Sequence, residues 1–260
     1  MKKILITGAN SYIGTSFEDY MKDYSEYQID TLDMKDPNWN KYDFSGYDIV
    51  FHVAGIAHQK ETKENASLYY KINRDLAIEV ATKAKQSNVK QFIFMSSMSV
   101  YGLEYSNELI TLNTPLKPKT NYGKSKMEAE EQIMKLADKD FIISIVRPPM
   151  VYGDGCPGNL TKLFNAVRKI HIFPTIRNER SSITVERLSE KINDIIEENK
   201  SEIYLPQNDE YMCTYEIVKE QMIKEKVKVL FIPIFNPIIK IMIGKVRLIT
   251  KVFGDLKYEK

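Results

Sequence analysis

The 260-residue sequence predicts an α/β fold with a parallel sheet that is covered by helices on both faces. Short apolar runs alternate with segments of helical period over roughly the first 150 residues, which is the pattern of βαβ units. A glycine-containing turn joins the first apolar run to the first helical segment, and serines follow the fourth run. We therefore expect a doubly wound domain over residues 1–150 and a smaller lobe over residues 151–260 that returns in part to the sheet.

Each expected strand is a short apolar run that ends at a turn or at polar residues. The strands are expected at 3–7, 27–32, 47–54 and 91–95, and the helices at 15–24, 68–87 and 160–170. His52 interrupts an otherwise apolar run, so we expect it to be a core or packing residue rather than a ligand.

The composition indicates an ordinary globular protein, with 43% apolar and 28% charged residues. A net charge of +2 is too small to indicate a nucleic-acid partner. Cys156 and Cys213 have neither metal-ligand spacing nor disulfide density, so we expect a reducing, cytoplasmic compartment and no metal. No apolar stretch reaches the roughly 20 residues of a transmembrane helix, and residues 1–8 resemble a strand more than a signal peptide.

The turn after the first strand has the composition of a dinucleotide-binding loop. A strand, a glycine turn and a helix bring free amides toward a pyrophosphate. Gly8 permits the tight turn and Gly14 close packing of helix on strand, whereas Ser11 stands where many such loops carry glycine. A turn that binds no ligand is the alternative. The expected contacts are Gly8, Asn10, Ser11, Tyr12, Ile13 and Gly14.

Asp33 ends the second expected strand, 19 residues after Gly14. A carboxylate at this place bonds the adenosine ribose 2′-OH and disfavours a 2′-phosphate. Lys35 lies within reach of such a phosphate. The cofactor is therefore expected to be NAD(P)(H), with NAD(H) favoured over NADP(H).

Tyr122 and Lys126 are four residues apart, so on a helix they share one face. A phenol with a pKa of about 10 is a poor base at neutral pH, but a fixed ammonium and an oxidised nicotinamide favour the phenolate. Ser97 follows the fourth strand, where a hydroxyl faces the ligand crevice of a parallel sheet. A surface helix and a strand-end cap are the alternative interpretations.

Several motifs occur in one order along the chain. They are Thr7-Gly8-x5-Gly14, Val53-Ala54-Gly55, Ser96-Ser97-x-x-Val100-Tyr101-Gly102, Tyr122-x3-Lys126 and Arg147-Pro148-Pro149. In these motifs, over most of its length, the chain resembles the extended short-chain dehydrogenase/reductases that act on nucleotide sugars. The resemblance implies a Rossmann-like domain followed by a substrate-binding lobe.

Within that family, three segments are most similar to bacterial capsule and O-antigen enzymes that reduce a UDP-2-acetamido-2,6-dideoxy-4-hexulose at C4, of the UDP-N-acetylfucosamine synthase type. The segments are 92–96, 146–153 and 156–159. The resemblance implies that Ser97 bonds the C4 oxygen and Tyr122 transfers the proton. Lys126 then binds the nicotinamide ribose and lowers the pKa of Tyr122.

The resemblance also implies further binding residues. Cofactor contacts are expected from Tyr122, Lys126, Asp43, Phe44, Val53, Ala54, Gly55, Asn73 and Pro149. A UDP-sugar is expected at Ser97, Ser99, Tyr122, Asn159 and Arg180. Arg180 falls where relatives carry an arginine that clamps the diphosphate. A helix N-cap at Asn159 and an exposed, strand-opening Arg180 are the alternatives.

The residues around Ser97 help to separate the reactions of the family. The resemblance implies that 4,6-dehydratases of the family carry Thr-Asp-Glu at this place, because dehydration needs an added acid and base. This chain has Ser97-Met98-Ser99, so dehydration is not expected. The resemblance favours a C4 ketoreductase in surface-polysaccharide precursor synthesis. A UDP-hexose or UDP-N-acetylhexosamine 4-epimerase with tightly bound NAD is the alternative, and the C4 configuration of the product stays open.

Residues 227–254 are apolar and basic and are interrupted by Pro233 and Pro237. Short helices that close the substrate lobe are one interpretation. Peripheral contact with the anionic inner face of the cytoplasmic membrane is the other. A homodimer through the helix that carries Tyr122 and the helix before it is left open by the resemblance.

Overall fold

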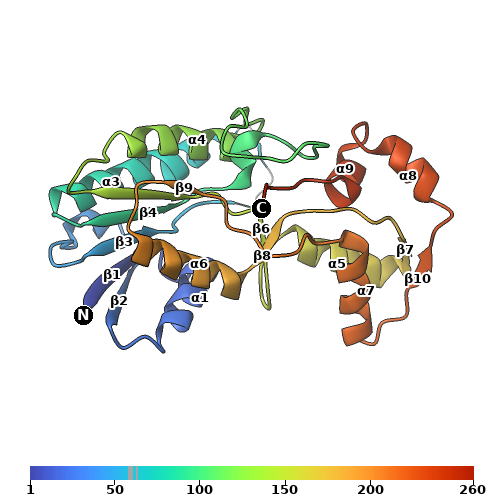
Figure 1. Cartoon of the computed structure of the whole chain (residues 1–260), viewed down its shortest axis with the longest axis horizontal. Coiled ribbons are helices and arrows are strands. Elements are labelled where there is room, and N and C mark those ends of the chain that lie inside the picture. Colours follow the sequence, from blue (N-terminus) through green and yellow to red (C-terminus); the bar gives the residue numbers. More distant parts are fainter. Residues whose placement is uncertain (58–60, 63) are drawn as a thin grey trace. The chain divides into compact units, whose positions relative to one another are not determined.

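The computed structural model describes residues 1–57, 61–62 and 64–260 and divides the chain into two compact units (Figure 1). The first unit comprises residues 1–102, 115–153 and 183–206. The second comprises residues 103–114, 154–182 and 207–260. The chain thus leaves the first unit after residue 153 and returns to it over residues 183–206. The sequence predicts a division after residue 150 with a partial return to the sheet.

A six-stranded parallel sheet forms the centre of the first unit. The strand order is β2-β1-β3-β4-β5-β9, with bounds Tyr27–Leu32, Lys2–Thr7, Ile49–His52, Gln91–Met95, Ile142–Val146 and Ile203–Tyr204. The order reverses at β1, and a ligand crevice forms outside the carboxyl ends of the strands at such a point. Thr7 is in register with both Leu32 and His52, so these ends lie level. The predicted doubly wound α/β fold is confirmed.

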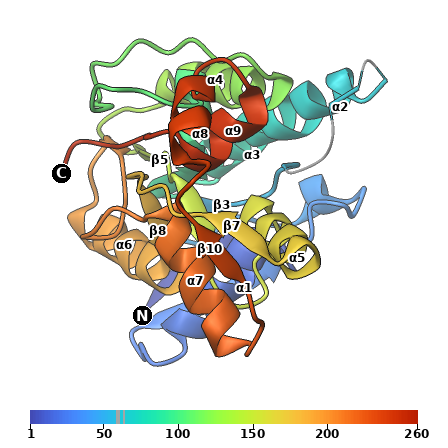
Figure 2. The same cartoon turned by 90° about the vertical axis from the view of Figure 1, so that its right-hand side faces the viewer.

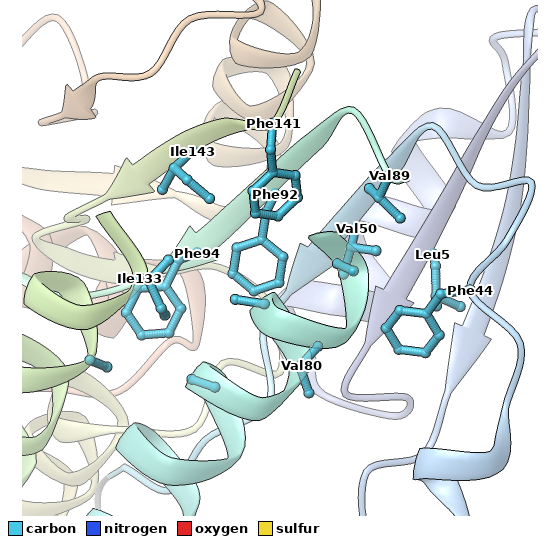
Figure 3. Close-up of a cluster of buried hydrophobic side chains, with 14 of the residues drawn as sticks. Leu5, Phe44, Val50, Val80, Val89, Phe92, Phe94, Ile133, Phe141 and Ile143 are labelled. Atoms are coloured by element: carbon cyan, nitrogen blue, oxygen red, sulfur yellow. The ribbon is translucent and has the colours of Figure 1, made fainter. Parts of the chain in front are cut away.

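Helices cover both faces of this sheet (Figure 1). On one face lie α3 (Leu76–Gln86) and α4 (Asn121–Met134), and on the other α1 (Tyr12–Met21) and α6 (Val185–Glu198). Figure 3 shows the first of the two cores, in which Phe92 and Val50 of the sheet pack with Val80 and Ile133 of the helices. Strands buried on both faces need continuous apolar runs, which is why these segments were recognisable.

The expected helix at 68–87 is divided into three. It consists of α2 (Ala66–Tyr70), a π-helical turn (Lys71–Asp75) and α3. Asn73 lies in the π turn with a fully buried side chain. Such turns insert an extra residue into a helix and occur frequently at functional sites.

Several other boundaries differ from the sequence prediction, and two of them have a clear cause. The first helix begins at Tyr12 rather than Thr15, because Ser11 caps it. The third strand ends at His52, because the amides of Val53 and Ala54 both turn back to the carbonyl of Thr7.

The second unit contains four α-helices, two of them short. They are α5 (Asn159–Ile170), α7 (Thr214–Lys224), α8 (Asn236–Met242) and α9 (Arg247–Phe253). In the same unit β7 (Ile172–Pro174) pairs in parallel with β10 (Leu230–Ile232). The core of the unit contains Val167, Phe173, Val218, Met222 and Phe253. Beside the main sheet, β6 (Met150–Tyr152) pairs with β8 (Ser182–Thr184). Among the described residues, no helix combines the length and apolarity needed to cross a bilayer.

Candidate active site

The loop between β1 and α1 has the backbone that close approach to a phosphate requires. Gly8 has a φ of +123°, and a Cβ at this position would lie 2.7 Å from the amide nitrogen of Ala54. Asn10 also has a positive φ, of 63°. Gly14 is equally constrained, because a Cβ there would lie 2.6 Å from Ser11 Oγ. The loop therefore packs against the end of β3 and has no space for larger residues.

Ser11 accounts for the missing middle glycine of this loop. Its Oγ accepts the Gly14 N–H at 3.2 Å and so caps α1. Tyr12 and Ile13 form the first turn of α1, where Ile13 packs against the core. The exposed Asp33 directly follows β2, and its Oδ1 accepts the Lys35 N–H at 2.9 Å. These features fit a dinucleotide, with the carboxylate next to the glycine turn.

Asp43 and Phe44 fit a cofactor site less well. The side chain of Phe44 is fully buried in the core, with Lys83 Nζ 5.1 Å from its ring centroid. The buried ring leaves the backbone of Phe44 as the part that could contact a cofactor, and such a contact stays a prediction. The exposed carboxylate of Asp43 accepts hydrogen bonds from Ser45, which lower its pKa.

Gly55, Asn73 and Lys126 come together beyond the end of β3. A Cβ at Gly55 would lie 2.9 Å from Asn73 Oδ1 and 3.4 Å from Lys126 Nζ. The Asn73 amide bonds both backbone groups of Ile56, at 2.9 Å and 3.1 Å, and its Nδ2 donates to Ser125 Oγ at 3.4 Å. The π turn thus fixes the loop after β3 to the helix of Tyr122 and Lys126. Val53 and Ala54 precede this point, whereas Pro149 is buried after β5.

Ser97 and Tyr122 meet above the end of β4. The Ser97 hydroxyl is hydrogen-bonded to the Tyr122 phenol. It also accepts the Ser99 N–H and contacts Ser99 Oγ, both at 3.1 Å, so it caps the 3₁₀ turn Met98–Tyr101 as well. Ser97, Ser99 and Tyr122 are all partly exposed. The capping interpretation and the catalytic interpretation are therefore compatible in one residue.

Two acceptors hold the start of α4, where Tyr122 is the second residue. Thr120 Oγ1 accepts the Gly123 N–H at 3.1 Å. The carboxylate of Glu61 accepts the amides of Asn121 and Tyr122, at 3.0 Å and 3.1 Å. A carboxylate at a helix N-terminus also interacts favourably with the positive end of the helix dipole. Sequence patterns gave no indication of Glu61, because its contact spans 60 residues.

The lowered pKa expected for Tyr122 is not found. Although the residue is only partly buried, the protein encloses the phenol and burial raises its pKa, against a smaller lowering by the Ser97 hydrogen bond. Lys126 is buried, donates to the Met95 carbonyl at 2.7 Å and lies 4.5 Å from the Phe94 ring centroid. Burial lowers the pKa of Lys126 to about 7, with Glu130 acting in the opposite direction. Both pKa values move toward the uncharged form, as burial requires.

A buried ion pair one turn further along α4 was not anticipated. Glu130 and Arg147 have side chains only 4% exposed, and Arg147 Nη2 lies 2.6 Å from Glu130 Oε2. Ser96 also donates to Glu130, and Arg147 Nη1 donates to the Tyr101 hydroxyl at 3.0 Å. The pair connects α4 to the end of β5, beside the serine turn that carries Ser97.

His52 is a core residue, as predicted. Its ring lies between Phe92 and Phe94, with both centroids at 6.0 Å, and its Nδ1 is 2.8 Å from Thr7 Oγ1. Burial and the nearby Lys126 lower its pKa to about 3, so the ring is neutral at physiological pH.

Asn159 and Arg180 belong to the second unit. Asn159 is exposed and is the first residue of α5, whose cap is Gly158, so the N-cap alternative is wrong. Arg180 is partly buried; its Nη1 donates to the Gly254 carbonyl at 2.5 Å, and burial lowers its pKa to about 10. In the described part of the chain, no group of three or more His, Cys, Asp or Glu side chains is arranged to hold a metal ion.

Comparison with known proteins places the chain in a family. Residues 4–177 match the model of the family described as "NAD dependent epimerase/dehydratase family". The chain belongs to this family. The match contains the glycine loop, the serine turn and the helix of Tyr122 and Lys126, and ends within the second unit.

Two curated members of the family illustrate the range of relatives. A UDP-glucose 4-epimerase from Vibrio cholerae is 29% identical over an alignment of 249 residues. The match covers 84% of this chain and 74% of that protein. An N-acetyl-alpha-D-glucosaminyl-diphospho-ditrans,octacis-undecaprenol 4-epimerase from Escherichia coli O157:H7 is 28% identical over 63% of this chain. The matched part spans only 53% of the E. coli protein.

Solved structures of family enzymes share the fold. A UDP-glucuronic acid 4-epimerase from Bacillus cereus in complex with NAD superposes with a TM-score of 0.75, at 17% identity over 88% of this chain and 85% of that one. A dTDP-4-dehydrorhamnose reductase from Bacillus anthracis str. Ames in complex with NADP gives 0.72, at 22% identity over 90% and 84%. At these identities the likeness establishes the Rossmann-like fold alone.

Proposed function

We propose that this chain is an NAD(P)-dependent oxidoreductase that acts at C4 of a nucleotide sugar and reduces the C4 ketone of a UDP-2-acetamido-2,6-dideoxy-4-hexulose. The observation that carries the proposal is the hydrogen-bonded pair of Ser97 and Tyr122, with Lys126 one turn along the same helix. Membership of the epimerase/dehydratase family supports the same class of chemistry.

Each residue has a distinct part in the proposed reaction. Ser97 donates a hydrogen bond to the C4 oxygen and stabilises the negative charge that develops there. Tyr122 protonates that oxygen as the general acid. Lys126 bonds the ribose next to the nicotinamide with the N–H donors that its bond to the Met95 carbonyl leaves available. The nicotinamide dinucleotide, when bound, supplies the hydride.

The protonation state of Tyr122 is compatible with the reducing direction. Burial raises it, so the phenol carries its proton at neutral pH. A ketone that is being reduced needs a proton donor at this place, whereas oxidation of an alcohol needs a base.

A 4-epimerase is the second candidate, and the relatives support it. Both curated relatives described above are named as 4-epimerases, and one matches most of this chain. An epimerase uses the same three residues in both directions and retains its cofactor. Ser97-Met98-Ser99 lacks the added carboxylates of a dehydratase, so we do not propose dehydration.

On the substrate side, we propose that Arg180 binds the diphosphate and that Asn159 bonds the sugar or the diphosphate. Arg180 has further N–H groups beyond the one that bonds Gly254. A bidentate guanidinium suits a diphosphate. The diphosphate carrier is proposed to be uridine. A polyprenyl carrier is worth testing in parallel, because the E. coli relative is named for one.

Incubation of the protein with the UDP-4-ketosugar and NADH or NADPH tests this proposal. Loss of absorbance of the reduced cofactor, with one equivalent of product formed per equivalent consumed, supports the reductase. Interconversion of UDP-GlcNAc and UDP-GalNAc without net loss of cofactor would replace it with the epimerase. If neither substrate reacts, the proposed function is wrong for uridine-linked sugars.

A further inference from the structure

Figure 2 shows helix α8 beside α9 in the second unit. The sequence of α8 places apolar residues on two of its faces. Ile239 and Ile243 pack inward against the core of that unit. Ile238 and Ile241 point the other way, with exposed fractions of 60% and 66%. A helix that only closes a lobe needs one apolar face, whereas the outer isoleucines of α8 are left largely exposed when this chain folds.

The exposed apolar side chains continue beyond both ends of α8. Ile234 and Phe235 precede the helix, and Leu248 follows it on α9, with exposed fractions of 72%, 47% and 74%. We call these five residues the α8 surface: Ile234, Phe235, Ile238, Ile241 and Leu248. Single exposed apolar residues are common, but several large ones in a short segment mark a site of interaction.

The charge of this segment is one-sided. From Lys226 to Gly254, with both ends included, the chain has six Lys and Arg residues and no Asp or Glu, although the whole chain has 37 basic and 35 acidic residues. Arg247 and Lys251 are paired with Glu104. Lys240 and Lys245 are exposed, and in the described part of the chain no ion pair is formed by either.

We propose that the α8 surface docks on an anionic lipid bilayer. Isoleucine, leucine and phenylalanine side chains enter the boundary between headgroups and acyl chains, while Lys240 and Lys245 extend along them to the phosphates. A symmetric contact with a second copy is disfavoured, because it would place the same unpaired lysines opposite each other. An anionic bilayer offers an apolar medium for the exposed apolar side chains and negative charge for Lys240 and Lys245.

The test is co-sedimentation of the full-length chain with vesicles of phosphatidylcholine alone and of phosphatidylcholine with phosphatidylglycerol. The full-length chain is expected to sediment with the anionic vesicles, and less so as salt is added. Substitution of both exposed isoleucines, Ile238→Ser with Ile241→Ser, is expected to abolish sedimentation. Substitution of both lysines, Lys240→Gln with Lys245→Gln, is expected to weaken binding roughly 30-fold. Each lysine near an anionic surface contributes about 1 kcal/mol, and about 1.4 kcal/mol corresponds to a tenfold change in affinity.

A matched control removes two equally exposed isoleucines from the same unit. Ile170 at the end of α5 and Ile223 on α7 are 64% and 65% exposed. The variant Ile170→Ser with Ile223→Ser is expected to bind vesicles as the unmodified chain does. Circular dichroism establishes that each variant is folded, and vesicle binding is independent of any catalytic activity.

Three outcomes would overturn the proposal. The first is that the unmodified chain does not sediment with anionic vesicles. The second is that the α8 variant and the control variant bind equally. The third is a dimer in analytical ultracentrifugation that is lost only in the α8 variant, without vesicle binding, which would assign the surface to a second copy.

Discussion

Tyr122 is subject to two opposing influences. Enclosure by the protein raises the pKa of its phenol, and the hydrogen bond from Ser97 lowers it to a smaller extent. Lys126 lies on the same helix, but its ammonium is bonded to the Met95 carbonyl. The pair therefore consists of a protonated phenol and a lysine whose pKa of about 7 makes it sensitive to its surroundings.

The substitution Tyr122→Phe removes the proposed proton donor and retains the ring. Turnover should fall by about 10²–10⁴, the usual contribution of a general acid, with a similar thermal midpoint. Steady-state kinetics and thermal unfolding measure the two effects. Tyr42→Phe is the control, because Tyr42 is an exposed tyrosine bonded to Tyr47, and it should keep full activity. Undiminished turnover in Tyr122→Phe would remove the residue from the reaction.

Lys126 should give the cofactor-free chain a pH-dependent stability. Its pKa falls from 10.5 when unfolded to about 7 when folded. Between these values the unfolded chain binds the proton and the folded chain does not, so stability rises with pH from about 7, by up to about 1.4 kcal/mol per pH unit. Urea unfolding at pH 7, 8 and 9 should show this slope as the difference between the unmodified chain and Lys126→Met. Equal slopes in both proteins would show that the ammonium is not desolvated.

At the scale of elements, α4 is the part on which the site depends. Its start is held by Thr120 and Glu61, its second turn by Asn73 of the π turn through Ser125, and its third turn by Arg147 through Glu130. Because these contacts come from the loop after β3, the π turn and β5, the position of Tyr122 reports on several elements together.

Loss of the Glu61 carboxylate leaves two amides of α4 without an acceptor. Glu61→Ala should cost about 1 kcal/mol, as N-cap substitutions do, and should lower turnover because the Tyr122 backbone is released. Denaturant unfolding and kinetics measure these effects. Glu131→Ala, at an exposed position of the same helix, should change neither. If the two variants were indistinguishable, Glu61 would have no positioning role.

The ion pair of Glu130 and Arg147 is almost fully buried. Glu130→Gln should cost about 3–5 kcal/mol, because it leaves a buried guanidinium without its counter-charge. The control is Glu128→Gln on the same helix, whose partner Arg74 is one-third exposed. It should cost at most about 1 kcal/mol. Similar losses of unfolding free energy in both variants would mean that burial of the pair is not decisive.

For the whole molecule, local sequence patterns predicted those strands, turns and motif residues whose structure depends on interactions between nearby residues. Local sequence patterns located β2 and β4 with their observed bounds, and the glycine loop located the turn into α1. The serine turn and the tyrosine-lysine spacing likewise located residues that the structure brings together.

What the sequence did not predict depends on contacts between distant segments. The sequence predicted a partial return of the second lobe to the sheet, but not that residues 183–206 make it. They do so because α6 has an apolar face that packs against the sheet, and nothing near residue 183 shows where that face will be buried. Glu61 and Glu130 look like ordinary surface acids in the sequence. Their partners are 60 and 17 residues away, so only the folded chain reveals them.

Reduction at C4 by the Ser97, Tyr122 and Lys126 site is the central claim, and transfer of a label tests it most directly. The protein would be given the UDP-4-ketosugar and a reduced nicotinamide dinucleotide that carries deuterium on the transferred position of its ring. If the protein reduces the ketone, the product is a UDP-sugar that carries a hydroxyl and one deuterium at C4. Tyr122→Phe should not form this product. A product without deuterium at C4, or an unchanged ketosugar with intact cofactor, would contradict the account.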